Sequence, residues 1–364
     1  MKQAVLYPFK REDIPYILSG DKIYDQYEIT DVVAPCGSGL CGKDISYADN
    51  RGNFGVKVKE NLEEALKKRD ALLVTSGNQE KYYVGIEDAI YTALQCEKDI
   101  ICNAKLSVKK RREIALLCKQ KRRNFIYGQE ERIQWRDVIV TGTHRLRTPI
   151  AFVTSILADA NNIELMLKVK KALDAMGYNV LTVGATPEIQ MYGGVYSGIL
   201  DSLVNGRFQS DSVPVTIKLL NHFLWCVENQ KSPDLMMLEI PGGLIETPDF
   251  PNESGTFAYI ITRAVQADYV IGTTLYGNYT DDSMLKISEE IERRFGFCLN
   301  CLHVSNKMLH ITSSMHKQEM QYIYMPLDGV ITKNHRAGDI LVGNFLEPSQ
   351  AKLIAEDMVR TMGG

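Results

Sequence analysis

The chain has 364 residues, 45% of them hydrophobic, so it can bury a sizeable core, and its length favours two domains. Its formal net charge of −3 gives no general attraction to nucleic acid or to anionic membranes. No apolar run is long enough for a transmembrane helix, and the scattered cysteines are typical of reduced thiols in the cytoplasm. We therefore expect a cytoplasmic protein without a nucleic-acid or membrane partner, and the sequence leaves open whether it forms a homo-oligomer.

Strands alternate with helices through residues 1–130, which predicts a parallel sheet in a Rossmann-like α/β domain. The expected strands are short apolar runs: Ala4–Tyr7, Tyr27–Pro35, Ala71–Thr75, Asp99–Asn103 and Asn124–Tyr127. The expected helices have apolar residues at helical spacing: Asn61–Lys68, Val84–Gln95 and Val108–Lys119.

A polar connector, residues 131–148, separates this domain from a second α/β domain over residues 149–364. The second domain opens at Pro149–Gly184 with a buried strand, a polar turn, an amphipathic helix and another strand, as in a P-loop NTPase. Further strands are expected at Asp234–Ile240, Tyr269–Thr273 and Phe297–Val304, and helices at Val213–Asn229, Gly255–Gln266, Asp282–Phe295 and from Pro348. The segment Met308–Leu346 is less regular. The predicted second domain is thus a parallel α/β structure of the P-loop NTPase type.

The turn after the first strand of this domain lacks the residues with which a P-loop binds phosphate. A P-loop places glycines before a lysine, so that backbone N–H groups surround the phosphate and the lysine contacts its outer oxygens. In the matching frame, Ile156 and Asn161 stand at the glycine positions and Asn162 at the lysine. The next lysines begin at Lys168, at least about 9 Å farther along the helix. We therefore predict a degenerate P-loop, with Asn161 and Asn162 as candidate ligand-binding residues.

A second candidate is the strand that ends in Glu239 and is followed by Pro-Gly-Gly. A buried strand with a terminal carboxylate is typical of magnesium sites in NTPases, and glycines allow the backbone to approach phosphate. An ordinary core strand with a turn has the same pattern. We take Glu239 as a candidate magnesium ligand, Gly242 and Gly243 as phosphate-binding residues, and Asn306, which closes another strand, as a base-binding residue.

Three other segments are weaker candidates. Gly37–Asp44 fits G-x-x-x-x-G-K, but no helix follows it, which favours a plain loop; Lys43 and Asp44 stay as weak ligand-binding candidates. Arg145 and Arg147 precede the second domain and suit an anionic ligand or an acidic peptide, although basic runs are usually surface. The segment Thr182–Gly194 leaves its strand at the sheet edge where α/β domains bind ligands.

The order of these motifs resembles a known family. A Rossmann-like domain carrying Gly-Leu-Cys-Gly-Lys-Asp precedes the polar turn and the Glu-x-Pro-Gly-Gly strand, and Phe250–Tyr259 and Arg294–Lys307 complete the order. Over essentially its whole length the chain resembles the clostridial-type peptide maturation system proteins, which accompany ribosomally synthesised, post-translationally modified peptides. More distantly it resembles proteins that join a Rossmann-like domain to a dethiobiotin-synthetase-like P-loop domain.

The resemblance implies a role in maturing a bacteriocin-type natural-product peptide, with a precursor peptide or a peptide-modifying enzyme as partner. By position, Glu239, Gly242 and Gly243 match the phosphate and magnesium side of the related P-loop domain, and Asn306 matches the base side. The implied ligand is ATP or GTP with magnesium.

Asn162 departs from the lysine of the related P-loops, so we expect an accessory protein that binds a ligand or partner without hydrolysing ATP. The alternative is an active nucleotide-dependent ligase or an acyl or phosphoryl transferase, with magnesium on Glu239. In that case Arg145 or Arg147 would supply the missing positive charge. The sequence alone leaves open whether the chain is an enzyme.

Overall fold

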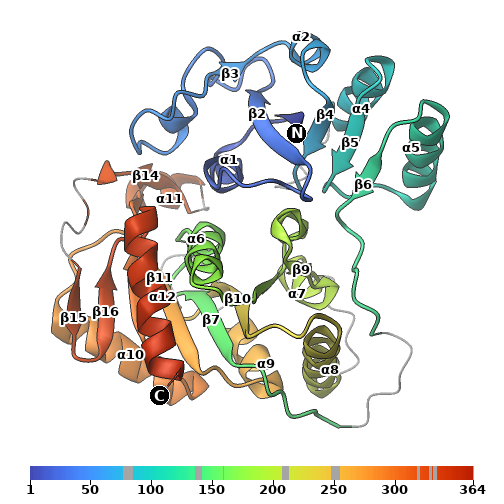
Figure 1. Cartoon of the computed structure of the whole chain (residues 1–364). Coiled ribbons are helices and arrows are strands. Elements are labelled where there is room, and N and C mark those ends of the chain that lie inside the picture. The colour runs from blue at the N-terminus through green and yellow to red at the C-terminus, as the bar shows by residue number, and fades with distance from the viewer. Residues whose placement is uncertain are drawn as a thin grey trace. The chain divides into compact units, whose positions relative to one another are not determined.

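A computed structural model describes residues 1–76, 85–135, 142–158, 160–206, 213–246, 255–317, 320–327, 330 and 334–363. The chain divides into two compact units, and both are parallel α/β structures, as predicted (Figure 1). The first unit comprises Met1–Glu131 and Thr186–Tyr196, and the second comprises Arg132–Ala185 and Ser197–Gly364. The segment Thr186–Tyr196, which we had placed in the second domain, is therefore an inserted part of the first unit.

The sheet of the first unit has six parallel strands in the order β3-β2-β1-β4-β5-β6. In chain order these are β1 (Lys2–Leu6), β2 (Tyr27–Val33), β3 (Val58–Lys59), β4 (Ala71–Val74), β5 (Asp99–Cys102) and β6 (Phe125–Tyr127). We did not predict β3, because two residues are too short to show a pattern. This is the Rossmann strand order. The first three strands are added toward one edge of the sheet and the next three toward the other edge, so the order reverses between β1 and β4.

The first unit also contains α-helices and short 3-10 turns. They are η1 (Arg11–Asp13), α1 (Ile14–Leu18), η2 (Ile45–Ala48), α2 (Leu62–Lys67), α4 (Ile86–Gln95), α5 (Val108–Gln120) and η3 (Pro187–Tyr192). Leu66 of α2, Ile90 of α4 and Ile114 of α5 share one hydrophobic core with Leu72 and Ile100 of the strands. Val84, the predicted first residue of the helix that is observed as α4, lies outside the described residues.

Seven strands of the second unit form one sheet in the order β15-β16-β12-β11-β7-β10-β8. In chain order these are β7 (Ile150–Ser155), β8 (Val180–Gly184), β10 (Leu235–Gly243), β11 (Tyr269–Thr274), β12 (Cys301–Val304), β15 (His335–Ala337) and β16 (Ile340–Gly343). The two-residue strand β9 (Val195–Tyr196) lies in the segment that belongs to the first unit. The pairs from β16 to β8 are parallel, and β15 is antiparallel to β16. Every residue of β7 is buried, as expected of a central parallel strand.

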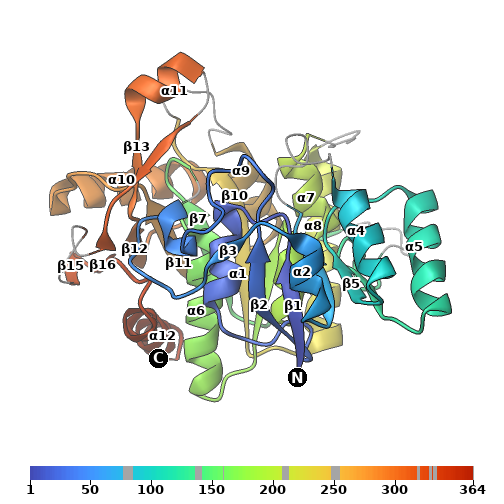
Figure 2. The ribbon, with the colours of Figure 1, turned by 90° about the horizontal axis from the view of Figure 1, so that it is seen from above.

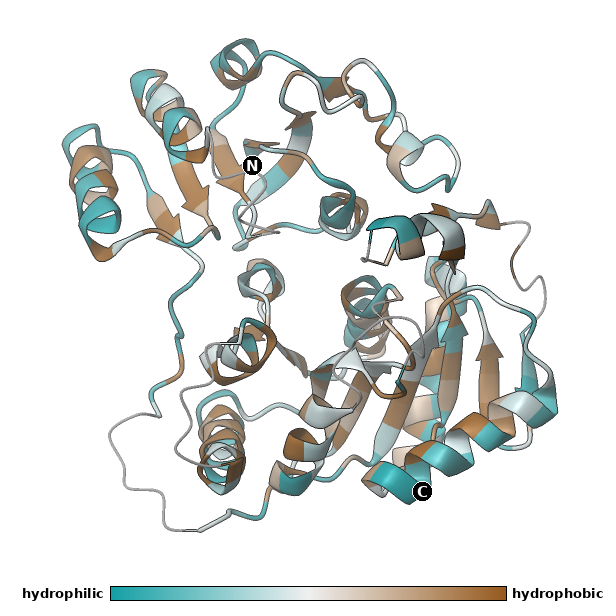
Figure 3. Ribbon diagram, turned by 180° about the vertical axis from the view of Figure 1, so that it is seen from behind, coloured by the Kyte–Doolittle hydropathy of each residue, from teal (hydrophilic) through white to brown (hydrophobic). Residues whose placement is uncertain are grey.

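The helices of the second unit are α6 (Asn162–Ala175), α7 (Gly198–Val204), α8 (Val213–Lys231), α9 (Thr256–Ala264), α10 (Asp281–Phe295), α11 (Ile311–Lys317) and α12 (Pro348–Met362). Figure 3 shows apolar strands and more polar outer faces of the helices. The segment that we expected to be less regular contains β15, β16 and an arm (Figure 2) of β13 (Lys307–Leu309), α11 and β14 (Tyr322–Tyr324). No helix within the described ranges is long and apolar enough to span a membrane.

Gly255, directly before α9, provides the first testable prediction. Its φ is +77°, and a Cβ there would lie 2.2 Å from Phe295 Cζ and 2.9 Å from the Leu244 carbonyl oxygen. We expect Gly255→Ala to lower the free energy of unfolding by about 2–3 kcal/mol, from backbone strain and overpacking together. Gly296→Ala is the matched control, because φ there is +79° but a Cβ would meet no atom within 4 Å. Equal losses in urea unfolding of the two variants would contradict the steric argument.

Candidate functional site

Asn162, at the position of a P-loop lysine, points into the second unit. It is the first residue of α6, and only 3% of its surface is exposed. Its Oδ1 accepts hydrogen bonds from Ser155 Oγ at 3.0 Å and from Thr273 Oγ1 at 2.5 Å. These hydroxyls belong to β7 and β11, so the amide joins the start of the helix to two neighbouring strands. We had predicted that this side chain contacts a ligand, whereas its Oδ1 is engaged in internal hydrogen bonds.

Asn161 and Asn306 come close to each other at the carboxyl ends of β7 and β12. Asn161 has a left-handed backbone conformation with φ of +75°, and its Oδ1 accepts a hydrogen bond from the Ser305 hydroxyl. The Asn306 side chain is fully buried, and its Nδ2 donates to the Met325 carbonyl oxygen at 3.1 Å. The predicted base-binding amide therefore fixes the segment after β14.

The Pro-Gly-Gly segment after Glu239 lies within β10 and does not form the loop that we predicted. The strand continues past Ile240 through a bulge, and Gly243 pairs with Ser155 of β7. The next N–H groups, of Leu244 and Ile245, donate to the carbonyl oxygens of Ser155 and Ile156 at 3.0 and 2.8 Å. Gly242, with φ of +79°, allows the bulge. This backbone is part of β10, so the predicted loop was wrong, and the phosphate-binding role of Gly242 and Gly243 stays a prediction.

Glu239 lies one strand away from the degenerate turn, on β10 beside β7. The carboxylate is mostly buried, and its Oε2 accepts a hydrogen bond from the Ala185 N–H at 3.0 Å. Ala185 follows β8, so this carboxylate joins the middle of β10 to the end of the neighbouring strand β8. In the part of the chain that the structure describes, no group of three His, Cys, Asp or Glu side chains could hold a metal ion. The magnesium role of Glu239 stays a prediction.

Arg145 and Arg147 lie at the opposite edge of the sheet from these residues. They precede the first residue of β7, Ile150, whereas Asn161 and Asn162 follow its last residue. A strand of this length separates its two ends by about 17–20 Å. The N–H groups of Arg147 and Thr148 donate to the Glu228 carboxylate at 2.7 and 2.6 Å. The structure thus does not bring either arginine to the degenerate turn.

Lys43 and Asp44 belong to a local turn of the first unit. The Asp44 carboxylate accepts hydrogen bonds from the N–H groups of Ser46 at 2.9 Å and Phe54 at 3.1 Å. The Lys43 ammonium lies 3.8 Å from the centroid of the Tyr47 ring. As we predicted from the sequence, no α-helix follows this glycine-rich loop, and the next element is the four-residue η2.

The structure brings together a cluster in the first unit that we did not predict as a unit. It consists of Lys10, Asp13, Thr75, Ser76 and Glu188, and it lies where β1 and β4 end. Ligands of Rossmann-like sheets bind at this reversal point. No glycine-rich fingerprint follows β1, because the next residues are Tyr-Pro-Phe-Lys-Arg. The first unit therefore has the sheet position at which Rossmann domains bind dinucleotides, but the segment after β1 lacks the glycines of that site.

Both carboxyl groups of this cluster are buried. Asp13 accepts hydrogen bonds from the Lys10 N–H and the Thr75 hydroxyl, both at 2.8 Å. Glu188 accepts from the Ser76 N–H and, at 2.8 Å, from the Ser76 hydroxyl. Burial raises the pKa of Asp13 to about 7 and also raises that of Glu188, although the Lys10 charge lowers both pKa values in part. Buried acids with shifted pKa values at a sheet edge are typical of functional sites, and also of structural ion networks.

Glu188 reaches this edge on the inserted segment Thr186–Tyr196, which is fixed along the first unit. Gln190 Nε2 donates to the Gly128 carbonyl oxygen at 2.6 Å, and the Tyr192 hydroxyl donates to the Tyr16 carbonyl oxygen at 2.7 Å. The Tyr24 N–H donates to the Met191 carbonyl oxygen at 2.8 Å. The segment therefore covers the edge where β4 and β6 end. The polar residues Glu188, Gln190 and Tyr192 were the only sign in the sequence that this segment has a role. Their partners are too distant in the chain to be inferred from the sequence.

Comparison with known proteins supports the fold. No protein-family model matches this sequence, and no curated protein matches it either. The chain is similar to the crystal structure of a DUF1611 family protein from Anabaena variabilis, with a TM-score of 0.54, 11% identity, and coverage of 84% of this chain and 88% of that one. A protein of Bacteroides fragilis assigned as an oxidoreductase matches with a TM-score of 0.26, 14% identity, and coverage of 49% and 51%. The first likeness shows that this chain shares the α/β fold of the DUF1611 family protein.

Proposed function

We propose that this chain is an accessory binding protein that does not hydrolyse ATP and that serves the maturation of a ribosomally synthesised peptide. The observation that carries the first part is the environment of Asn162. The side chain at the lysine position is neutral, buried and hydrogen-bonded to Ser155 and Thr273. Phosphoryl transfer depends on positioned positive charge around the transferred group, and this turn offers none.

The alternative, an active ligase or transferase, needs a substitute for the missing lysine. Arg145 and Arg147 were the candidates, and they lie at the amino end of β7, away from the turn. Glu239, the candidate magnesium ligand, accepts a hydrogen bond from Ala185. Nothing in this geometry favours the alternative.

The role in peptide maturation is supported by the motif order of the sequence, which resembles the clostridial-type peptide maturation system proteins. The proposed partner is the precursor peptide or the enzyme that modifies it. A protein that holds such a partner needs a stable scaffold and no catalytic turnover, and a P-loop fold without P-loop chemistry meets that requirement.

Nucleotide titration tests the first part of the proposal. We expect calorimetry with ATP or GTP to show no magnesium-dependent binding tighter than about 1 mM, and we expect no ATP hydrolysis above the buffer background. The matched variant is Glu239→Ala, which should behave as the wild type does. Magnesium-dependent binding that is lost in Glu239→Ala would overturn the proposal in favour of the enzyme.

Co-purification tests the second part. The tagged chain is expressed together with a precursor peptide and its modifying enzyme, and the eluate is analysed by mass spectrometry. We expect one of the two to be retained at micromolar concentration. If neither is retained, the role in peptide maturation is wrong, whatever the nucleotide result.

A further inference from the structure

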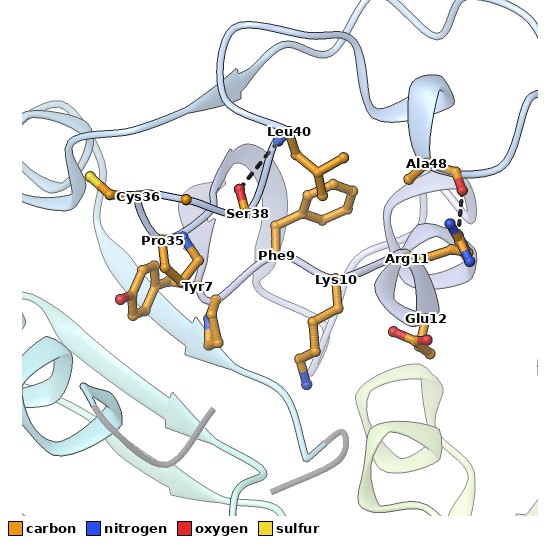
Figure 4. A pocket seen from close by; sticks show the side chains of 12 residues that line it. Tyr7, Phe9, Lys10, Arg11, Glu12, Pro35, Cys36, Ser38, Leu40 and Ala48 are labelled. Carbon is orange, nitrogen blue, oxygen red and sulfur yellow. Dashed lines mark hydrogen bonds between the residues drawn. The ribbon is translucent and has the colours of Figure 1, made fainter. Parts of the chain in front are cut away.

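A pocket of about 650 Å³ opens in the first unit between the segments that follow β1 and β2 (Figure 4). One wall is formed by the segment from Tyr7 to Glu12 and another by the segment from Pro35 to Leu40, with Ala48 beside them. Both walls follow the carboxyl ends of neighbouring parallel strands, the part of a Rossmann-like sheet where ligands bind. A volume of this size accommodates a small organic molecule and is far larger than an inorganic ion needs.

The walls of the pocket include apolar side chains suited to an organic body. Phe9 and Leu40 point toward one another in Figure 4, and Pro8 and Pro35 also line the space. Gly37, with φ of +84°, belongs to the second wall, and a Cβ there would meet no atom within 4 Å. The wall is therefore open at this glycine.

The charged groups of the pocket favour an anion. Lys10 and Arg11 line it against a single acid, Glu12, so the lining carries a net positive charge. Arg11 Nε donates to the Ala48 carbonyl oxygen, which fixes that guanidinium (Figure 4). Lys10 is the more informative cation, because only 7% of its surface is exposed although it lines the pocket. A buried ammonium interacts more strongly with an anion than an exposed one does, because water screens it less.

Asp13 and Glu188 are two buried carboxyls that interact electrostatically with Lys10. Asp13 and Glu188 each accept two hydrogen bonds from other groups of the first unit. Burial raises the pKa of Asp13 to about 7, so near neutral pH this carboxyl carries only part of a negative charge. The pair therefore neutralises Lys10 less than two ionised carboxylates would.

We propose that this pocket binds a small organic carboxylate, with the carboxylate on the Lys10 ammonium and the apolar body against Phe9 and Leu40. One buried lysine suits a monoanion better than a phosphate, whose sites usually gather several donors or cations. The site belongs to the first unit and does not depend on the nucleotide chemistry of the second. It stands or falls independently of the function proposed above.

The proposal is tested by titrating the full chain with three aromatic carboxylates of increasing length. These are benzoate, phenylacetate and 4-phenylbutyrate. We expect at least one to saturate below about 10 mM in calorimetry and its neutral amide to bind at least tenfold more weakly. The Lys10→Met variant should bind that carboxylate at least tenfold more weakly than the wild type does. Leu40→Trp, which fills the pocket and keeps the buried cluster, should do the same, whereas the exposed Leu116→Trp on α5 should leave binding unchanged.

Several results would overturn the proposal. One is that none of the three carboxylates saturates below about 10 mM, and another is that the amides bind as tightly as the acids. Inorganic phosphate that competes for the site with equal affinity would show a site for any anion. Binding that persists in Leu40→Trp would place the ligand elsewhere, and this variant decides the matter if circular dichroism shows that Lys10→Met does not fold.

Discussion

Replacing Asn162 by lysine restores the lysine of the P-loop pattern, yet we expect it to destabilise the second unit by about 3–5 kcal/mol and not to create nucleotide binding. The side chain is 3% exposed and accepts hydrogen bonds from Ser155 and Thr273, so a lysine would bury an ammonium in a site fitted to an amide. It would also remove the acceptor shared by the two hydroxyls. Burying a polar or charged group without its partners accounts for most of the expected loss.

Urea unfolding followed by tryptophan fluorescence measures this effect in the second unit alone, because both tryptophans, Trp135 and Trp225, belong to it. Met176→Lys is the matched control. It introduces the same residue at the exposed end of α6 and should change the free energy of unfolding by no more than about 0.5 kcal/mol. A stable Asn162→Lys variant that binds ATP with magnesium would show that this position is available to ligands after all.

Replacing Asp13 by asparagine is expected to remove a pH dependence from the stability of the first unit. Burial raises the pKa of this carboxyl from 3.8 to about 7. Between these values the folded chain keeps a proton that the unfolded chain has lost, so stability falls as pH rises through this window. A shift of about three units corresponds to at most about 4 kcal/mol between the two ends of the window. The loss is complete above the folded-state pKa and absent below the unfolded-state value.

Denaturant unfolding followed by circular dichroism at about pH 4, 5, 6, 7 and 8 measures this slope. The useful quantity is the difference in unfolding free energy between the wild type and Asp13→Asn at each pH, because groups that do not interact with Asp13 titrate equally in both proteins. Asparagine presents one N–H₂ group to the donors Lys10 N–H and Thr75 hydroxyl, so the variant is expected to be less stable at low pH and to lose the slope. Glu12→Gln, at the exposed neighbouring acid, should keep the slope. Parallel pH profiles of wild type and Asp13→Asn would contradict a raised pKa.

The repeating elements of the fold could be predicted because each carries a local pattern. The α/β class was confirmed, and α10 ends before Gly296 and α12 begins at Pro348, as their end signals indicated. The strands β3, β15 and β16 have between two and four residues, too few for a period to show, and α7 was missed for the same reason of length. Pro-Gly-Gly usually forms a turn, but here β10 continues to Gly243, which pairs with β7.

The candidate residues were harder to predict, because their roles depend on partners that are remote in the sequence. A polar turn with two asparagines is equally compatible with a ligand and with buried hydroxyls, and only the position of Thr273, which lies 111 residues from Asn162, decides between them. Glu188 and Ser76 are 112 residues apart, and nothing local identifies them as a pair. A linear sequence specifies such contacts only through the whole fold.

The inserted segment Thr186–Tyr196 has a consequence for how the protein is made. Synthesis runs from the N-terminus, and early domains usually fold while later ones are still being translated. Here the first unit lacks Glu188, Gln190 and Tyr192 until the ribosome has translated the first three strand and helix elements of the second unit. Until then the polar groups of Ser76 and Gly128 lack these partners. The nascent first unit should therefore mature late, and a gene fragment that encodes residues 1–131 alone should yield a frayed sheet edge.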